Sequence, residues 1–521
     1  MTEAGTSMAK EEDTQNVEYS GSEHTHALSV EHRQYLLQRH GTLDLEPVPD
    51  MSDGDPYNWP KSKKILNLAM IAFHAMMATF TAAAVQSVFA EIAADLDVSI
   101  HRASYMLSLQ IAVLGGAPLF WRPLAQRFGR RPIFLLSLIC SLVGNVGCAV
   151  SPSYATMGLC RAITAFFISP ASAIGSAVVA ETFFKKERAR YMGVWTMMVT
   201  LGVPMAPFIF GFVAVRVGYR WIYWILAITN GVQFILYFLL GRETLYLRGP
   251  TPAFSPTSAP HKSTPQSLLS FGRINPTPLT LGDFVQPLTF VARPCVFIPA
   301  AGYAMVFLWA NIMVSVETGQ LFPEKFGFDS QQVGLQNISI IIGSLIGEQI
   351  GGYASDWWMW RRHRKVINSS DSESQDDDGS TLAPQPEFRL WLGYPGYLLT
   401  ICGVVVYFIQ LDRAGHTWNV TPDVGMGIAA AGNQIVTTVM TTYAVDCYRE
   451  DAAGVGVFIN FVRQTWGFIG PFWFPEMIKQ AGFGASAGIA TAMLVVVSMI
   501  PTAVVQWRGR LWRQMLSSLS A

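Results

Sequence analysis

The chain has 521 residues, of which 51% are hydrophobic and 14% are charged, and its formal net charge is zero. This composition is too apolar for a soluble protein with an ordinary charged surface, so we expect a membrane protein. The six cysteines are scattered without a CxxC pair, and no Gly-Lys dipeptide occurs, which excludes a disulfide framework and a phosphate-binding loop for ATP.

The first half of the chain predicts six transmembrane helices. Residues 1–58 are polar and poor in branched apolar side chains, so we expect them to form a disordered cytoplasmic tail. Apolar runs of about twenty residues then divide residues 59–241 into spans. These are about Ile65–Ala90, Ser104–Ala125, Pro132–Val150, Tyr154–Phe183, Met192–Val215 and Trp221–Leu240.

The fifth span contains an unusual combination of glycines and prolines. It reads GVWTMMVTLGVPMAPFIFG from Gly193 to Gly211. Pro204 and Pro207 remove backbone donors, whereas Gly193, Gly202 and Gly211 allow neighbouring helices to approach closely. Such a helix is tolerated in a bilayer only among other helices or beside a cavity, so it predicts a polytopic bundle with a pathway through it.

The second half of the chain repeats the same pattern. Residues 242–293 are rich in Pro, Ser and Thr and predict a cytoplasmic linker. The bundle of residues 294–507 is then expected to hold six spans, with residues 363–388 as a disordered cytoplasmic loop and 508–521 as a cytoplasmic tail. The spans are about Pro294–Phe322, Gln332–Trp358, Leu390–Leu411, Pro422–Val445, Gly454–Met477 and Gly484–Val505.

Lys and Arg are concentrated in alternate loops, which places both termini in the cytoplasm. Asn419 begins an Asn-Val-Thr sequon on the opposite, outer side, close to the tenth span. It is a weak candidate for glycosylation.

Two basic loops occupy equivalent places in the two halves. PLFWRPLAQRFGRRP follows the second span, and GGYASDWWMWRRHRK follows the eighth. A repeated loop of this kind is typical of a duplicated transporter. The expected gating residues are Arg122, Gln126, Arg127, Gly129, Arg130 and Arg131 in the first copy, and Gly352, Asp356, Arg361 and Arg362 in the second.

On these motifs the sequence resembles the major facilitator superfamily, and most closely its fungal drug:proton antiporter branch with twelve spans. QRFGRRP is similar to the signature of the loop between helices 2 and 3, and Arg161 lies in a stretch similar to the helix-4 motif. The glycines and prolines of the fifth span resemble the helix-5 antiporter motif. The resemblance covers Trp59 to Trp507 and implies an all-α membrane protein of two pseudo-symmetric six-helix bundles.

The first basic loop departs from the family pattern at two positions. The family's acidic residue is Gln126 here, and its glycine is Arg122. In the family, that carboxylate is thought to latch the cytoplasmic face, so the resemblance implies a weaker or rearranged latch in the first half. Asp356 keeps the carboxylate in the second half.

Three ionisable residues within predicted spans are candidates for the transport pathway, because each charge there costs on the order of 2.5 kcal/mol or more. Arg161 is interpreted as a proton-relay or substrate-facing cation, with a structural pair to a neighbouring helix as the alternative. Glu317 is either the protonatable coupling group or a solvated acid near a helix end. Glu348 is either part of the pathway or a partner of the basic loop that follows it.

Polar amides also gather on the helices expected to line a central cavity. Each is either an interhelical hydrogen bond or a ligand, and together with Trp309 and Trp466 they favour an amphipathic organic substrate. They are Asn311, Asn433, Gln434, Asn460 and Gln464.

The sequence therefore predicts a secondary active transporter and not an enzyme. The main hypothesis is proton-coupled efflux of an amphipathic drug, toxin or secondary metabolite across the plasma membrane, by a monomer that uses alternating access. The alternative is proton-coupled uptake or facilitated transport of an organic cation, polyamine or nutrient. Its expected partners are the substrate, protons and the lipid bilayer, with no cofactor, metal or nucleic acid.

Overall fold

The protein was analysed as a computed structural model, which describes residues 28–247, 274–370, 386–415, 417–448 and 451–520. The side chains of residues 186, 189, 353–370 and 515–520 lie outside the described part. Within it, the chain is helical and contains no β-strand.

The first half forms a bundle of long helices preceded by two short elements. Their bounds are α3 (Val30–His40), η1 (Pro56–Asn58), α4 (Lys61–Ala83), α5 (Phe89–Asp95), α6 (Ile100–Phe128), α7 (Arg130–Ala149), α8 (Tyr154–Ile168), α9 (Pro170–Thr182), α10 (Lys185–Val217) and α11 (Arg220–Leu240).

A short connecting segment leads into the second bundle. The bounds are α12 (Leu281–Val285), η2 (Gln286–Ala292), α13 (Pro294–Phe307), η3 (Leu308–Met313), α14 (Val314–Phe326), α15 (Ser330–Ser370), η4 (Pro386–Leu392), α16 (Gly393–Arg413), α17 (Thr421–Cys447), α18 (Ala452–Ile469), η6 (Gly470–Phe472), α19 (Phe474–Met493), η7 (Leu494–Met499) and α20 (Ile500–Ser520).

The long helices match the spans predicted from the apolar runs. Ten helical segments of the described chain are long and apolar enough to cross a membrane. The more polar α17 and the shorter α18 complete a set of twelve long segments in the described residues. The fourth and eleventh predicted spans are interrupted because Pro170 begins α9 and Pro471 ends α18 at η6.

The two bundles lie side by side and meet through equivalent helices. The contacts between them include α10 against α15 and α6 against α18. In the six-helix numbering of each half, the first pair joins helix 5 to helix 2 and the second joins helix 2 to helix 5. This exchange of roles is what a two-fold axis between duplicated halves produces.

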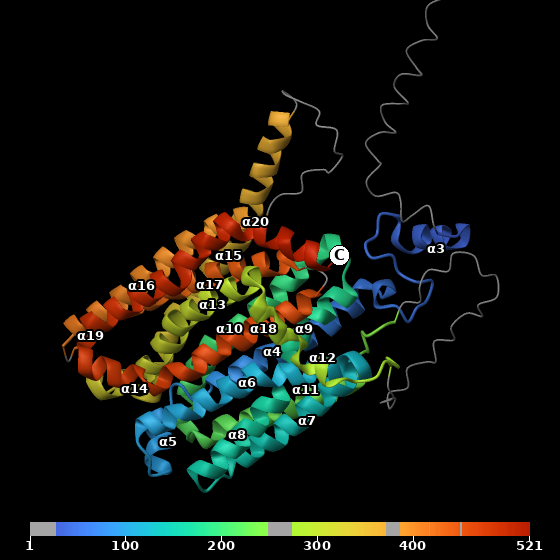
Figure 1. Cartoon of the computed structure of the whole chain (residues 1–521). Coiled ribbons are helices and arrows are strands. Elements are labelled where there is room, and N and C mark those ends of the chain that lie inside the picture. Colours follow the sequence, from blue (N-terminus) through green and yellow to red (C-terminus); the bar gives the residue numbers. More distant parts are fainter. Residues whose placement is uncertain (1–27, 248–273, 371–385, 416, 449–450, 521) are drawn as a thin grey trace, which may run out of the picture.

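The two ends of the bundle carry different elements (Figure 1). We call one end the α12 end, since it carries α3, α12 and the C terminus. The other is the α5 end, where α5 and the turn between α14 and α15 lie. The Lys and Arg pattern of the loops predicts that the α12 end faces the cytoplasm.

The polar N-terminal tail differs from the expected disorder in residues 28–58; residues 1–27 lie outside the described part. α3 and η1 are held against the first bundle by specific contacts. The Tyr57 hydroxyl donates to the Ala180 carbonyl, and the Tyr57 ring stacks on Phe184 with 5.1 Å between centroids. Lys64 donates to the Tyr57 carbonyl at 2.8 Å. Residues 28–58 are ordered because they pack against the first bundle.

Two other expected irregular segments are partly helical. α12 and η2 occupy the last part of the predicted linker, whereas residues 248–273 of that linker lie outside the described part. α15 continues to Ser370, beyond the predicted start of the loop at residue 363, and η4 begins at Pro386. The acidic insert at residues 371–385 also lies outside the described part.

Candidate functional site

The interface between the two bundles is closely packed where glycines remove side chains. A Cβ atom added to Gly334 of α15 would lie 2.5 Å from the Pro207 carbonyl oxygen of α10, and one added to Gly211 of α10 would clash with the Ser330 carbonyl. Gly202 instead faces α4 of its own bundle, where an added Cβ would lie 2.6 Å from the Met76 carbonyl oxygen. The predicted motif therefore packs α10 on both of its sides.

The remaining motif residues of α10 have different surroundings. No described atom of another segment lies within 4 Å of a Cβ added to Gly193, so this glycine makes no close helix contact. Pro204 and Pro207 are buried inside the continuous helix Lys185–Val217. Of the three glycines in the α10 motif, Gly202 and Gly211 are thus the two that leave no room for a side chain.

The seventh long segment is interrupted in its middle by a π-helical stretch. η3 (Leu308–Met313) separates α13 from α14 and contains both Trp309 and Asn311. Single π-helical turns within α-helices occur frequently at functional sites. The Trp309 indole N–H and the Asn311 Oδ1 are buried and have no hydrogen-bond partner in the structure. These groups are available to a ligand.

Glu317 is the least satisfied ionisable residue predicted for the pathway. Its side chain lies on α14, it is 0% exposed, and neither carboxylate oxygen has a hydrogen-bond partner among the described residues. Unpaired buried carboxylates are costly unless they carry a proton or meet a cation. The expectation of a solvated acid near a helix end does not fit this burial, which favours the protonatable interpretation.

The amides of α18 contact α6 across the interface. The Asn460 Nδ2 donates to the Leu114 carbonyl at 3.2 Å, and Gln464 packs against Gly115, where an added Cβ would lie 2.7 Å from the Gln464 Cβ. Arg463 donates to the Asn460 Oδ1 at 2.8 Å and to the Tyr303 hydroxyl at 3.0 Å. Gln464 retains a buried, unpartnered Oε1.

Glu348 and Gln434 are brought together between α15 and α17. The Gln434 Nε2 donates to the Glu348 carboxylate and lies 3.4 Å from the Thr200 Oγ1 of α10, which belongs to the other bundle. The space beside them is lined by Met197, Leu201 and Ser344 among others. Its volume of about 10 Å³ is close to the minimum that one water molecule needs. Asn433, next along α17, has a buried and unpartnered Oδ1.

Arg161 lies inside the first bundle and not at the interface. It is 0% exposed. Its guanidinium donates to the Met106 carbonyl at 3.2 Å, to the Tyr223 hydroxyl at 3.2 Å, to the Ala82 carbonyl at 3.4 Å and to the Gln110 Oε1. All of these acceptors are neutral, and they tie α8 to three other helices of its own bundle. This arrangement is what the structural alternative predicts.

A charged cluster joins the two bundles at the α12 end. Arg122 on α6 donates to the Asp451 Oδ1 and to the Gln286 Oε1, each at 2.6 Å, and Gln286 donates to the other Asp451 oxygen. Asp451 also caps the N terminus of α18, because its Oδ1 accepts from the Gly454 N–H at 3.0 Å. We call Arg122, Gln286 and Asp451 the α12-end latch.

The two departures from the family motif have different surroundings. Gln126 forms no side-chain hydrogen bond with any residue that the structure describes. Arg122, at the position where the resemblance gives glycine, pairs with Asp451 of the other bundle at 2.6 Å. The ion pair of the α12-end latch therefore joins the two halves.

The other residues of the first basic loop contact the first bundle and α12, and not the second bundle. Arg130 pairs with Glu181 at 2.6 Å, and Arg127 lies 3.4 Å from Asp283 of α12. Gly129 adopts a φ of +97° and has no room for a side chain, since an added Cβ would lie 2.8 Å from the Glu243 carboxyl carbon.

Glu243, just after α11, closes the start of α7. It accepts from the Arg130 N–H at 2.8 Å and the Arg131 N–H at 2.9 Å. Burial raises the pKa of this carboxyl, although the backbone N–H bonds oppose that effect. The arginines of the loop thus contact α7, α9, α11 and α12. They hold these elements together in addition to determining the orientation of the chain in the membrane.

The second basic loop can be placed only in part. Gly352 lies on α15 with no atom of another segment within 4 Å of an added Cβ. Asp356, Arg361 and Arg362 continue α15, but their side chains lie outside the described residues. Asn419 is exposed before α17, and its Oδ1 accepts from the Thr421 N–H at 3.0 Å.

Four functional candidates escape the sequence analysis. Asp451, Gln286 and Glu243 lie outside the apolar spans, where an acid or amide is unremarkable until its partner is known. Asp423 occupies the first turn of α17, yet it is 7% exposed and its Oδ1 is unpartnered. Its position inside the predicted span Pro422–Val445 is the signal that could have identified it.

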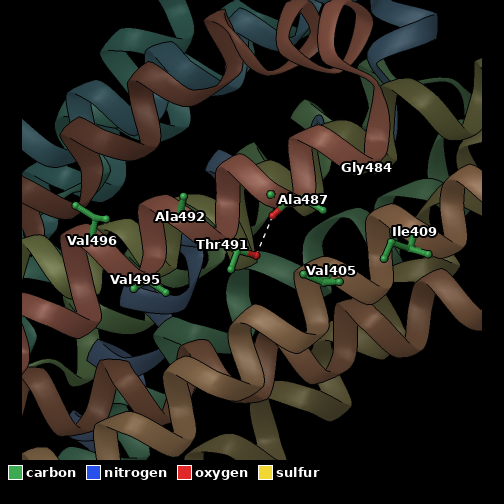
Figure 2. A pocket seen from close by; sticks show the side chains of 9 residues that line it. Val405, Ile409, Gly484, Ala487, Thr491, Ala492, Val495 and Val496 are labelled. Atoms are coloured by element: carbon green, nitrogen blue, oxygen red, sulfur yellow. Dashed lines mark hydrogen bonds between the residues drawn. The ribbon is translucent and has the colours of Figure 1, made fainter.

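An open groove on the second bundle is not part of this interface. It has a volume of about 500 Å³ and lies between α16 and the α19–η7 segment, lined by apolar residues such as Val405, Ile409 and Val496 (Figure 2). The Thr491 hydroxyl in its wall already donates to the Ala487 carbonyl at 2.9 Å. With no free polar group and no residue from the first bundle, the groove suits lipid chains.

Comparisons with known proteins agree on one family. The model of the Major Facilitator Superfamily matches residues 70–471. The efflux pump radE of Floropilus chiversii is 25% identical over 469 residues, covering 88% of this chain and 82% of its own. The MFS-type transporter tndD of Aspergillus flavipes is 25% identical over 473 residues, covering 88% and 83%.

A solved structure supports the same fold. It is a bacterial homologue of the human lysosomal transporter Spinster, in an inward-facing and unoccupied conformation. The TM-score is 0.57 at 16% identity, and the match covers 88% of this chain and 99% of that one. This likeness concerns the fold alone.

Proposed function

Because the chain belongs to the Major Facilitator Superfamily, we propose that this transporter exports an amphipathic small organic molecule in exchange for protons. Glu317 carries the proposal, since it is a fully buried carboxylate without a partner on the interrupted seventh segment. An acid in this position needs a proton whenever water is excluded from it.

The expected substrate follows from the mixture of groups at the interface. Buried amide oxygens without partners among the described residues, at Asn311, Asn433 and Gln464, occur together with the fully buried indole of Trp309. Sites of this kind suit an apolar molecule with a few hydrogen-bond donors. The name of the relative radE, an efflux pump, supports export, and drugs, toxins and secondary metabolites are the candidate substrates.

Alternating access would use contacts that exist at both ends of the interface. At the α12 end, the latch residues Arg122 and Asp451 join the bundles. At the α5 end, the Ser330 hydroxyl of α15 donates to Glu91 of α5, and an added Cβ at Gly319 would clash with the Gln86 carbonyl. One set must open while the other stays closed, so that the two bundles rock about the interface.

The proposal places the transporter in the plasma membrane as a monomer with both termini cytoplasmic. The α12 end then faces the cytoplasm, and its basic loops agree with the usual excess of Lys and Arg on that side. Proton-coupled uptake or facilitated transport of an organic cation is the second candidate, because the unpartnered Glu317 carboxylate would also accept a cation.

Mass spectrometry of the culture medium separates the two candidates even while the substrate is unidentified. Cells that express the wild-type chain are compared with cells that express Glu317→Gln at the same membrane level. Export predicts a compound that accumulates in the medium of the wild type and is retained in cells with Glu317→Gln. Depletion of a medium component by the wild type, with no exported compound, would instead establish uptake.

A further inference from the structure

A second buried acid lies near Glu317 in the C-terminal bundle. Asp423 is on the first turn of α17, and it shares with Glu317 the absence of a partner for a buried carboxylate oxygen. Tyr407 on α16 is 0% exposed, and the Thr318 hydroxyl, next to Glu317, donates to the Met426 Sδ of α17 at 3.4 Å. The Tyr407 hydroxyl also shares a hydrogen bond of 3.2 Å with the Thr318 Oγ1 of α14. Three helices thus meet around one tyrosine.

Cations of the surrounding elements are engaged elsewhere. Lys325 on α14 donates to the Leu411 carbonyl, and Arg220 pairs with Asp95 of α5 at 2.7 Å. Arg102 of α6 lies over the Tyr154 ring, with 5.2 Å to its centroid. On α16, Arg413 is exposed. No described cation therefore neutralises either acid.

The other acids and titratable groups of these elements also have their own surroundings. Glu91 of α5 accepts from Ser330, and His101 of α6 bonds the Tyr105 hydroxyl at 2.8 Å. Asp412 on α16 and Glu324 on α14 are exposed to solvent. Glu317 and Asp423 are thus distinguished as buried acids, 0% and 7% exposed, without a counter-charge among the described residues.

We propose that Glu317 and Asp423, arranged around Tyr407, form the proton-carrying site of the transporter, and that both acids hold protons while the α5 end is closed. Two carboxyl groups without counter-charges are compatible with this packing only in their neutral forms. The proposal rests on the proposed function in assigning this site to transport, but the bound protons can be observed without any transport.

The position of the site links proton occupancy to closure. Gly319, two residues beyond Glu317 on α14, packs against the Gln86 carbonyl of the other bundle at the α5 end. Separation of the bundles there would admit water to α14 and allow the acids to ionise. Reclosure would then require protons to return, which couples proton binding to the conformational change.

Infrared spectroscopy of the purified protein in lipid detects protonated carboxyl groups directly. At neutral pH we expect the wild type to show their carbonyl band. Part of that band should disappear in Glu317→Gln, and a different part in Asp423→Asn. Glu324→Gln and Asp412→Asn make the same changes at exposed acids on the same or the adjacent helix and should leave the band unchanged.

Isotope labelling of the wild type assigns the band without any substitution, so this assignment does not depend on whether the variants fold. Carboxyl-¹³C glutamate should shift one component of the band, and carboxyl-¹³C aspartate should shift another. The proposal is overturned when no aspartate component exists, or when the band survives intact in Glu317→Gln or in Asp423→Asn. Absence of proton-dependent transport would reject the proposed function and leave the spectrum as it is, so the two failures are distinguishable.

Discussion

At the scale of single residues, Arg161 shows how a motif residue and a structural residue can be the same side chain. The resemblance assigns it to the pathway, whereas its hydrogen bonds hold α8 to Met106, Gln110 and Tyr223 of its own bundle. No carboxylate contacts it within the described residues. A cation placed among neutral acceptors can orient the helices around a site without touching the substrate.

We therefore expect Arg161→Ala to reach the membrane with little transport and with a lower stability. Loss of the guanidinium leaves buried acceptors unpartnered, which should lower the free energy of unfolding by about 2 kcal/mol. Thermal melting followed by intrinsic fluorescence measures the stability, and Arg161→Lys is the control that keeps the charge. A wild-type melting temperature with lost transport would assign Arg161 a purely functional role.

At the scale of helices, α10 offers a comparison between two glycines of one motif. Gly202 faces α4, with the Met76 carbonyl oxygen 2.6 Å from an added Cβ, whereas Gly193 faces open space. Gly202→Leu should separate α10 from α4 and cost about 1–3 kcal/mol through overpacking. Gly193→Leu should be tolerated.

Both glycine variants can be measured by gel filtration of the detergent extract, thermal melting and transport. The prediction is a large loss in Gly202→Leu against near wild-type behaviour in Gly193→Leu. Equal effects of the two substitutions would show that the close approach of α10 to α4 has no importance for folding or transport.

The positions of the helices could be predicted from the sequence, whereas the contacts between the helices could not. Apolar runs located the long segments because a bilayer imposes their length. Breaks at Pro170 and Pro471 were visible as prolines, but whether a proline interrupts a helix or continues within it, as Pro204 does, depends on neighbouring segments. The π-helical stretch around Asn311 has no comparable sequence signal.

The same distinction applies to the candidate site. Glu317, Glu348 and Gln434 could be identified from the sequence because polar side chains inside apolar runs are conspicuous. The pairing of Arg122 with Asp451 could not be predicted, since the two residues are 329 positions apart and belong to different bundles. Gln126 indicated only that the usual latch was altered.

At the scale of the whole molecule, the α12-end latch should bias the balance between the open and closed forms of that end. Arg122 and Asp451 are 14% and 28% exposed, so their ion pair should contribute about 1 kcal/mol, or roughly a fivefold change in the ratio of the two forms. Arg122→Gln and Asp451→Asn each remove the pair, and the asparagine still caps α18.

Spin labels at the exposed positions Arg190 and Arg510, one in each bundle at the α12 end, would report the separation. Each single substitution should populate longer distances. The double variant should add little to either, because both remove one interaction. Lys185→Gln, which breaks the Lys185 pair with Glu46 of the N-terminal segment and not a pair between the bundles, is the control. Additive effects, or none, would contradict the latch.

Coupling of substrate movement to protons is the central claim, and flux into inside-out membrane vesicles tests it most directly. The compound identified in the culture medium is supplied outside the vesicles. A proton gradient is imposed so that the vesicle lumen is more acidic than the outside. We predict that wild-type vesicles accumulate the compound, that a protonophore abolishes accumulation, and that Glu317→Gln vesicles do not accumulate it under either condition. Equal accumulation by wild-type vesicles with and without the gradient would contradict the account.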